Sequence, residues 1–439
     1  MPAPGNNNKL GLWTTTSLVI GNMIGAGVFL MPAALASFGG ISLFGWLFSA
    51  IGAFFLAKVF SNLSKLLPGV NGGPYAYTHA GFGDFAGFII AWGYWISVWV
   101  SNATLAVAFV SGLTTFSTIL QQSRVLQVLT GLSAIWLLTW VNTRGLKTGG
   151  LMQLITTILK LLPLLFVAVG GIFFIHLNNF IPFNISGTSN MQAITASGAL
   201  TFFAFLGVEC ASIPAGNVEN PEKTVPRATM LGTVFTTLVY VLVTVTVMGI
   251  IPAEQLQKSA TPLADAAAII GGNAARYFVG AGVALAAFGA LNGWILIQGQ
   301  IPFAIAKDNL FPGVFKKENK RGAPAAGIII GSVLVSVLMY MNYNDALVKQ
   351  YTFLSLLATL TSLVPYLFCA GAYALITLAN TGSGKANRPA AIAIAAISFA
   401  FSLWAVIGSG QQVVYWGFVL LMAGIPFYVW IIYMKNKAG

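Results

Sequence analysis

Three glycines interrupt the first long apolar stretch of this chain, within the segment Gly21-Asn22-Met23-Ile24-Gly25-Ala26-Gly27. Each glycine in a helix interior costs about 1 kcal/mol relative to alanine, so the spacing predicts a helix that breaks here. A break inside a bilayer leaves carbonyl and N–H groups free, which is tolerated only where protein or a watery cavity supplies partners. The break is therefore a candidate binding site. The alternative is a flat glycine face for close helix packing.

Two ionisable residues lie deep inside other apolar stretches and are candidates for proton transfer. Lys160 is near the centre of the stretch 149–175, and Glu209 lies in the stretch 193–216. A charge at the bilayer centre costs at least about 2.5 kcal/mol, so such residues usually face a cavity and often relay protons. The alternatives are a structural ion pair between Lys160 and Glu209, or a lysine held by carbonyl groups of the broken first helix.

The composition defines the class of protein that holds these residues. Hydrophobic residues make up 57% of the 439 residues and charged residues only 7%, which excludes an ordinary soluble domain. Twelve apolar stretches are long enough to cross a bilayer core of about 30 Å. They cover residues 12–36, 41–66, 85–116, 125–142, 149–175, 193–216, 228–251, 277–306, 325–341, 351–378, 390–408 and 413–434. We therefore expect an all-α membrane protein with twelve transmembrane helices.

The distribution of basic residues predicts the orientation of these helices. The excess of 21 basic over 9 acidic residues alone could indicate nucleic-acid binding. If the stretches cross in alternation, however, fifteen basic residues lie on the side of the termini and four on the other, with Lys58 and Lys160 inside stretches. Basic residues concentrate in cytoplasmic loops of membrane proteins. We expect a multi-pass protein of the bacterial inner membrane with cytoplasmic termini, in contact with lipid and not with nucleic acid.

Residues for other kinds of chemistry are scarce. Cys210 and Cys369 lie inside apolar stretches and His79 and His176 in separate loops, so we expect no metal site and no disulfide framework. The chain has no glycine-rich phosphate loop ending in Lys-Ser or Lys-Thr, so we expect no nucleotide hydrolysis, no cofactor and no enzyme activity. A channel would need rings of charge or repeated filter carbonyls, which are missing.

The stretch 193–216 is interrupted in a similar way to the first. It has Gly207 in its middle, Glu209 two residues later and Pro214 near its end. Paired interruptions at matching places in two repeats are the best sequence indication of a transporter's central site. We expect one transmembrane domain over 1–439, with inverted repeats at about 11–175 and 193–378 and two further helices at about 390–434.

Several motifs together resemble the amino acid–polyamine–organocation transporters, most closely the bacterial arginine:agmatine and lysine:cadaverine antiporters. The motifs are GNMIGAGVFLMPAALASFGGI at 21–41, GGPYAY at 72–77, FLGVECAS at 205–212, GNVENPEKTVPRAT at 216–229, GWILIQGQ at 293–300 and LVPYLF at 363–368. The resemblance implies a LeuT-like 5+5 inverted repeat with discontinuous helices 1 and 6, alternating access and a homodimer.

The resemblance and the physics of a broken helix together suggest how an amino acid is bound. Free N–H groups at a helix N-terminus favour an anion, so the groups near Ala26 and Gly27 are expected to bind the substrate carboxylate. Carbonyl groups at the ends of the first half-helices would bind its ammonium. These carbonyls lie around Asn22 and Met23 and from Phe203 to Leu206.

The resemblance also implies a pocket for the substrate side chain. Trp294 matches a tryptophan that stacks on a cationic tail, a contact of about 2 kcal/mol when it is desolvated. Ser97 and Asn102 match further contacts with the tail. The chain departs from the arginine antiporter where Ala26 and Ala358 replace serines and where Phe203 replaces a gating tryptophan, so arginine is only one possible substrate.

Gating and coupling residues follow from the same motifs. Tyr94, Glu209 and Tyr366 match a hydrogen-bonded layer that closes one side of the site, and Phe203 is the expected lid. Tyr75 matches a position linked to pH response. The alternatives are that Tyr366 satisfies its hydroxyl within the bundle and that Tyr75 anchors a loop at the membrane interface.

Lys160 instead resembles the helix 5 lysine of proton-linked amino acid permeases, whose ammonium takes the place of a sodium ion in sodium-driven relatives. The sequence thus predicts a secondary transporter that exchanges a cationic or small neutral amino acid for a related amino acid or its amine, with or without protons. The alternatives are a proton-coupled permease for small neutral amino acids and, less favoured, a transporter-like amino acid sensor.

Overall fold

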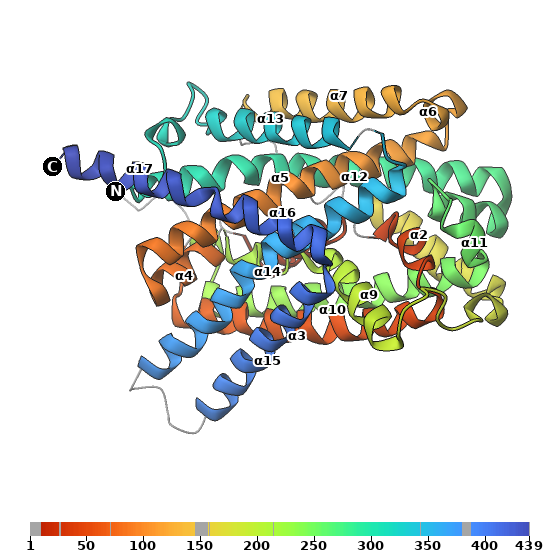
Figure 1. Ribbon diagram of the computed structural model, residues 1–439, viewed down its shortest axis with the longest axis horizontal. Helices are drawn as coiled ribbons and strands as arrows, with labels where there is room; N and C mark the ends of the chain where they lie inside the picture. Colours follow the sequence, from red (N-terminus) through yellow and green to blue (C-terminus); the bar gives the residue numbers. More distant parts are fainter. Residues whose placement is uncertain are drawn as a thin grey trace, which may run out of the picture.

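The computed structural model describes residues 10–25, 28–70, 72–144, 157, 159–213, 215–342, 344–379 and 388–438. Its α-helices are α1 (Leu12–Met23), α2 (Met31–Ala36), α3 (Ser42–Leu66), α4 (Pro74–Phe82), α5 (Asp84–Thr114), α6 (Thr118–Gln122), α7 (Arg124–Asn142), α9 (Asn190–Phe202), α10 (Pro221–Ile250), α11 (Ala253–Leu256), α12 (Pro262–Lys307), α13 (Ala325–Met341), α14 (Leu347–Ala379), α15 (Arg388–Gly408), α16 (Gln411–Met422) and α17 (Gly424–Ala438). Most of them run roughly along the long axis of one bundle (Figure 1).

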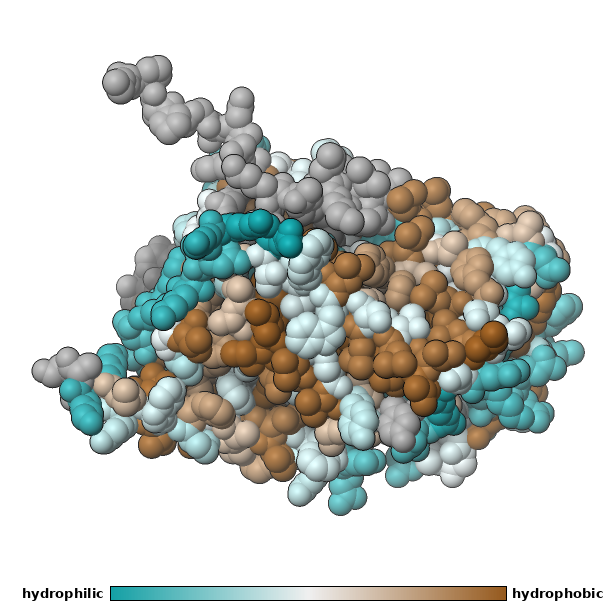
Figure 2. Space-filling model, turned by 90° about the horizontal axis from the view of Figure 1, so that it is seen from above, coloured by the Kyte–Doolittle hydropathy of each residue, from teal (hydrophilic) through white to brown (hydrophobic). Residues whose placement is uncertain are grey.

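Among the residues that the structure describes, nine helical segments are long and apolar enough to cross a membrane. Two shorter apolar helices, Leu159–Phe174 and Ala325–Met341, accompany them, and α1 and α2 together occupy the predicted span 12–36. Hydrophobic residues gather over the middle of the surface in Figure 2, whereas polar residues lie toward its ends. This distribution suits a bundle with lipid around its middle and water at both ends.

Contacts between distant loops identify one end of the bundle. Leu10 pairs with Val218 in an isolated parallel β-bridge. The Tyr75 hydroxyl donates a hydrogen bond to Asp308 Oδ2 at 2.7 Å. Leu10 precedes the first predicted span. Tyr75 follows the second, Val218 the sixth and Asp308 the eighth. We call this end, where α4 lies in Figure 1, the basic end, because Lys307 and most other basic residues belong to its loops.

A second set of contacts identifies the opposite end, near α11 in Figure 1. Gln257 Nε2 donates to the carbonyl of Ala36 at 3.3 Å, and Ser111 Oγ donates to the carbonyl of Ala260 at 2.5 Å. Ala36 and Ser111 lie at or near the ends of the first and third predicted spans, and Gln257 and Ala260 follow the seventh. The first, third and seventh predicted spans therefore end opposite to the second, sixth and eighth, as expected for helices that cross in alternation.

The helix α5 lies at the centre of the bundle. It packs along α12 and α14 and is buried over most of its length. The pair α7 and α13 lies on one flank, and α3 and α10 lie side by side on the other (Figure 1). This arrangement places side chains from α5, α10, α12 and α14 around the interrupted segments.

Two predicted spans differ from the observed helices in extent or continuity. The predicted span 277–306 belongs to the longer α12, which begins at Pro262 and has a kink at Gly271 and Gly272, where Gly272 has φ +68° and ψ −162°. Only glycine adopts this conformation readily, which explains the kink. The predicted span 413–434 is divided into α16 and α17. Residues 149–156 of the span 149–175 lie outside the described residues.

Candidate substrate site

The first helix is interrupted where its glycines predict. The helix α1 ends at Met23, and α2 begins at Met31 with Pro32 in its first turn. Ala26 and Gly27, the expected carboxylate ligands, lie outside the described residues. The second α-helical segment thus begins later than the expected start near Ala26 and Gly27, because proline favours the first turn of a helix.

Lys160 donates to two of the carbonyl groups that the end of α1 sets free. Its Nζ lies 2.5 Å from the carbonyl oxygen of Gly21 and 2.7 Å from that of Ile24. The side chain is buried, at 2% exposure. Of the roles that the sequence leaves open, this geometry matches a lysine held by the broken helix and not an ion pair with Glu209, whose carboxylate has other partners.

Two aromatic residues bind the carbonyl groups between these two. The hydroxyl of Tyr240, on α10, donates to the carbonyl of Met23 at 2.5 Å. Trp294 Nε1, on α12, approaches the carbonyl of Asn22 at 3.4 Å. Each carbonyl group from Gly21 to Ile24, at the end of α1 and its C-cap, therefore has a side-chain donor, as the burial of a helix end requires. Tyr240 could not be singled out from the sequence, since a tyrosine in an apolar helix usually indicates packing.

The sixth predicted span is also interrupted, beside the first interruption. After α9, a 3₁₀ turn covers Phe203–Phe205, and Gly207 follows with φ +104°. A Cβ atom on Gly207 would lie 3.3 Å from Asn22 Cβ and 3.4 Å from Met23 N. The two interruptions are therefore packed against each other, with a glycine at the contact.

We predict that Gly207→Ala lowers the melting temperature and the transport rate, because a side chain at this φ costs about 1–2 kcal/mol and must also push against α1. Gly410→Ala is the matched control: Gly410 has φ +87° but open space around the Cβ position. Thermal unfolding of both variants in detergent, with transport measured alongside, tests the contact. Equal effects of the two substitutions would mean that backbone strain alone matters.

A cavity lies between the two interruptions and the helices α5 and α12. Its water-accessible volume is about 20 Å³, which is enough for a water molecule and too little for an amino acid. Its lining consists of Asn22, Met23, Gly25, Ser101, Leu105, Phe203, Leu206 and Trp294. Substrate entry therefore requires a lining side chain to move.

Five residues expected from the sequence lie together around this cavity: Asn22, Met23, Phe203, Leu206 and Trp294. Phe203 is buried there, with its ring edge-on to the ring of Tyr351 at 6.0 Å between centroids. Its side chain is held by packing and not by a hydrogen bond, as a lid that turns aside would need.

Three other expected contacts do not line the cavity. Ser97 Oγ donates to the carbonyl of Tyr94 on its own helix at 2.7 Å, and Asn102 Nδ2 donates to Gln298 Oε1 at 2.8 Å. Ala358 is buried within α14. Ser101 and Leu105 face the cavity instead and were not predicted.

The expected layer of Tyr94, Glu209 and Tyr366 is assembled on the basic side of the cavity. The hydroxyl of Tyr94 donates to Glu209 Oε1 and that of Tyr366 to Glu209 Oε2, each at 2.6 Å. All three side chains are buried, at 2% exposure or less. The layer ties α5 and α14 to the interrupted sixth helix, which is the arrangement that the predicted gate requires.

Tyr75 lies farther out, at the basic end itself. Burial, with the hydrogen bond to Asp308 second, raises the pKa of the Tyr75 hydroxyl above its ordinary value. The hydroxyl is therefore protonated at every physiological pH. The tyrosine itself therefore cannot supply a pH response at this position.

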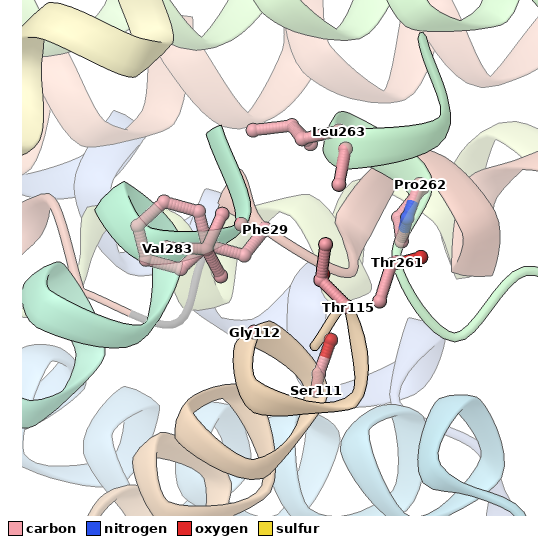
Figure 3. Close-up of a pocket in the computed structure, with 10 residues that line it drawn as sticks. Phe29, Ser111, Gly112, Thr115, Thr261, Pro262, Leu263 and Val283 are labelled. Carbon is pink, nitrogen blue, oxygen red and sulfur yellow. The ribbon is translucent and has the colours of Figure 1, made fainter. Parts of the chain in front are cut away.

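A second, smaller cavity lies toward the opposite end, between the start of α12 and the end of α5 (Figure 3). Its water-accessible volume is about 10 Å³. Phe29, Ser111, Thr261 and Leu263 are among its lining residues. Among the described residues, no three His, Cys, Asp or Glu side chains come together as a metal site would need.

A small buried cavity between two interrupted helices, inside a bundle of membrane-length helices, defines a multi-pass membrane transporter. The sequence pattern of the family described as Amino acid permease matches residues 10–434. The chain belongs to this family, whose members are transporters and not enzymes.

Named relatives are similar over most of the chain. The arginine/ornithine antiporter of Pseudomonas aeruginosa is 32% identical over 424 residues, which cover 93% of this chain and 87% of the relative. The cadaverine/lysine antiporter of Escherichia coli K12 is 34% identical over 337 residues, 76% of this chain and 74% of the relative. The putrescine transporter PotE of Haemophilus influenzae is 29% identical and covers 97% of this chain and 98% of the relative.

Proposed function

We propose that this protein is a secondary antiporter that exchanges an amino acid for a related amino acid or its amine. The observation that carries the proposal is the cavity between the two helix interruptions, where Trp294 and the end of α1 meet. The names of the relatives, which pair arginine with ornithine and lysine with cadaverine, support exchange and a cationic substrate.

The proposed fold has twelve crossings, built as two inverted five-helix repeats with helices 11 and 12 added. The alternation of loop contacts between the two ends of the bundle supports it. We propose cytoplasmic termini in the inner membrane because the basic end holds most Lys and Arg residues. A homodimer is part of the same proposal, on the resemblance to the antiporters.

In the proposed cycle the substrate occupies an enlarged form of the cavity. Its ammonium would lie at the carbonyl groups around Asn22 and Met23, its carboxylate at N–H groups near Ala26 and Gly27, and its tail against Trp294. Phe203 would turn aside on entry, and release toward the basic end would require the layer of Tyr94, Glu209 and Tyr366 to open.

The second candidate function is proton-coupled uptake of a small neutral amino acid. The observation that favours it is Lys160, whose amine binds carbonyl groups of the broken helix in place of an external cation. Loss of the proton from this amine would weaken its hold on α1, so transport and protonation could be linked. An amino acid sensor has no specific observation in its favour.

Exchange in proteoliposomes tests these functions directly. Vesicles are preloaded with arginine, lysine or ornithine, and uptake of labelled substrate is challenged with arginine, agmatine, lysine, ornithine, putrescine, alanine and serine. Uptake that depends on a preloaded solute supports the antiporter. Uptake into empty vesicles driven by an imposed pH gradient favours the proton-coupled permease. If no solute competes and no preloaded solute drives uptake, neither function holds.

We predict that Trp294→Ala weakens binding of a cationic substrate by about tenfold or more, because a desolvated cation–π contact contributes about 2 kcal/mol. Binding of alanine should change by less than about threefold. Trp294→Phe keeps a ring face and should retain most of the affinity for the cation. Competition against labelled substrate measures both ligands, and equal losses for the two would argue against cation–π recognition.

A further inference from the structure

A groove lies on the outside of the bundle, where α14, α15 and α16 pack together (Figure 1). Its outer part is a cavity with a water-accessible volume of about 410 Å³. Two charged side chains and three amides are among the residues that line this part: Asn342, Asp345, Lys349, Gln411 and Gln412. The outer part is therefore polar and suits a group that carries charge or forms hydrogen bonds.

The inner part of the groove is apolar and has a water-accessible volume of about 130 Å³. Its walls include aliphatic side chains from three helices: Leu360 and Val364 from α14, Val406 from α15, and Val414 and Leu421 from α16. Thr361 also lines it, but its hydroxyl donates to the carbonyl of Leu357 on its own helix, at 2.8 Å. The inner part therefore suits a hydrocarbon chain and would penalise a polar group.

The two parts follow each other along both helices. On α14, Leu356 lines the outer part, and Leu360, one turn later, lines the inner part. On α16, Val413 lines the outer part, and the residues from Val414 to Leu421 that follow it extend for about 12 Å. The groove is thus polar at its mouth and apolar beyond it, which is the pattern of an amphiphilic ligand.

The mouth of the groove lies at the level of one membrane surface. The helix α13 begins after Asn319, whose Nδ2 donates to the carbonyl of Thr143, at 2.6 Å, in the loops of the basic end. The 17 residues of α13 rise about 25 Å, close to the thickness of a bilayer core. Asn342, directly after α13, therefore lies near the opposite membrane surface, and the inner part of the groove lies at the depth of acyl chains.

The charges at the mouth form an opposed pair. Lys349 Nζ lies 2.7 Å from Asp345 Oδ1, and the two side chains are 73% and 36% exposed. Asn342 Nδ2 donates to the carbonyl of Leu338, at 2.8 Å, so the oxygen is the end of this amide that remains for a donor. One cation and one anion beside amide oxygens match a headgroup that carries both signs of charge and has N–H donors.

We propose that the groove binds one phospholipid with an ethanolamine headgroup. The phosphate lies at Lys349, the ammonium lies at Asp345 and the amide oxygens, and one acyl chain fills the inner part. A choline headgroup has no N–H donor for these oxygens, and a glycerol headgroup brings no cation to Asp345. This site is separate from the central cavity, and the inference does not depend on which solute the protein transports.

Native mass spectrometry of the purified full-length protein measures the headgroup preference. Protein stripped of lipid is offered equal amounts of phosphatidylethanolamine, phosphatidylcholine and phosphatidylglycerol, all with oleoyl chains. The wild type should retain one ethanolamine lipid per protomer, with about fivefold preference over each of the others.

Removal of one charge should change this preference. Asp345→Asn leaves Lys349 unopposed, so phosphatidylglycerol should become the lipid that is retained best. Glu254→Gln is the matched control, because Glu254 forms a similar pair with Lys258, at 3.8 Å, outside the groove. This control should keep the preference of the wild type.

Substitutions in the inner part test the place of the acyl chain. Val406→Trp, on α15, and Val414→Phe, on α16, each put a ring into this space. Each should lower the retention of all three lipids at least about tenfold, which corresponds to the loss of about two buried methylene groups. Thermal unfolding without lipid shows whether each variant is folded, and either one suffices for the test.

Three results would overturn the proposal. Equal retention of the three headgroups by the wild type, or an unchanged preference in Asp345→Asn, would rule out the headgroup contacts. Unchanged lipid retention in a folded Val406→Trp or Val414→Phe protein would place the lipid elsewhere. A wild type that retains no lipid and forms dimers that Val406→Trp dissociates would assign the groove to a second copy of this chain.

Discussion

Replacement of Lys160 by alanine is expected to reduce net transport at least tenfold and to flatten its dependence on pH. The amine donates to the carbonyl groups of Gly21 and Ile24 at the break of the first helix. Its removal leaves two buried acceptors without donors, and each costs about 1–3 kcal/mol. If the amine also exchanges protons during transport, its loss removes the titrating group itself.

The measurement is initial uptake from acidic to mildly alkaline pH in proteoliposomes, with exchange and net uptake recorded separately. Lys58→Ala is a suitable control, because Lys58 lies over the ring of Phe54, at 5.0 Å, and away from the break. Lys58→Ala should keep the pH profile of the wild type. A Lys160→Ala protein with a reduced rate and an unchanged pH profile would assign the lysine a structural role alone.

The sequence was sufficient to predict both interruptions because each has a local cause. The glycines from Gly21 to Gly27 weaken one helix, and Gly207 supplies a positive φ that other residues avoid. The lengths of the apolar stretches likewise predict the helices, since a bilayer requires about 20 residues per crossing. The alternative roles of Lys160 could not be distinguished from local sequence, because its partners are carbonyl groups of a helix some 140 residues earlier in the chain.

The residues that face the cavity were harder to predict. The helix α5 is buried on nearly all sides, so it has no lipid-facing stripe from which the phase of its side chains could be read. Ser97 and Asn102 were chosen by resemblance, whereas Ser101 and Leu105 line the cavity in the closed structure. The hydrogen bond between Asn102 on α5 and Gln298 on α12, which is oriented by contacts with α13, is revealed only by the packing of three helices.

Glu209→Ala is expected to lower the thermal stability and to reduce exchange at least tenfold. The carboxylate accepts hydrogen bonds from the buried hydroxyls of Tyr94 and Tyr366. Alanine leaves both hydroxyls without this acceptor, at about 1–3 kcal/mol each. The layer would then no longer connect α5, α14 and the interrupted sixth helix, so its closed form would lose stability relative to the open one.

Glu209→Gln distinguishes hydrogen bonding from charge in this layer. The amide oxygen can accept from one tyrosine while its NH₂ group donates to the other, so we expect exchange within about threefold of the wild type. Tyr373→Phe is the control on α14, because it removes a hydroxyl that accepts from Asn62 Nδ2, at 2.9 Å, outside the layer. In a protein that already carries Glu209→Ala, Tyr94→Phe or Tyr366→Phe should lower thermal stability and exchange by little more, because the hydrogen bond that each would remove is already lost. If Glu209→Gln is as inactive as Glu209→Ala, the negative charge and not the hydrogen-bonded layer is what transport requires.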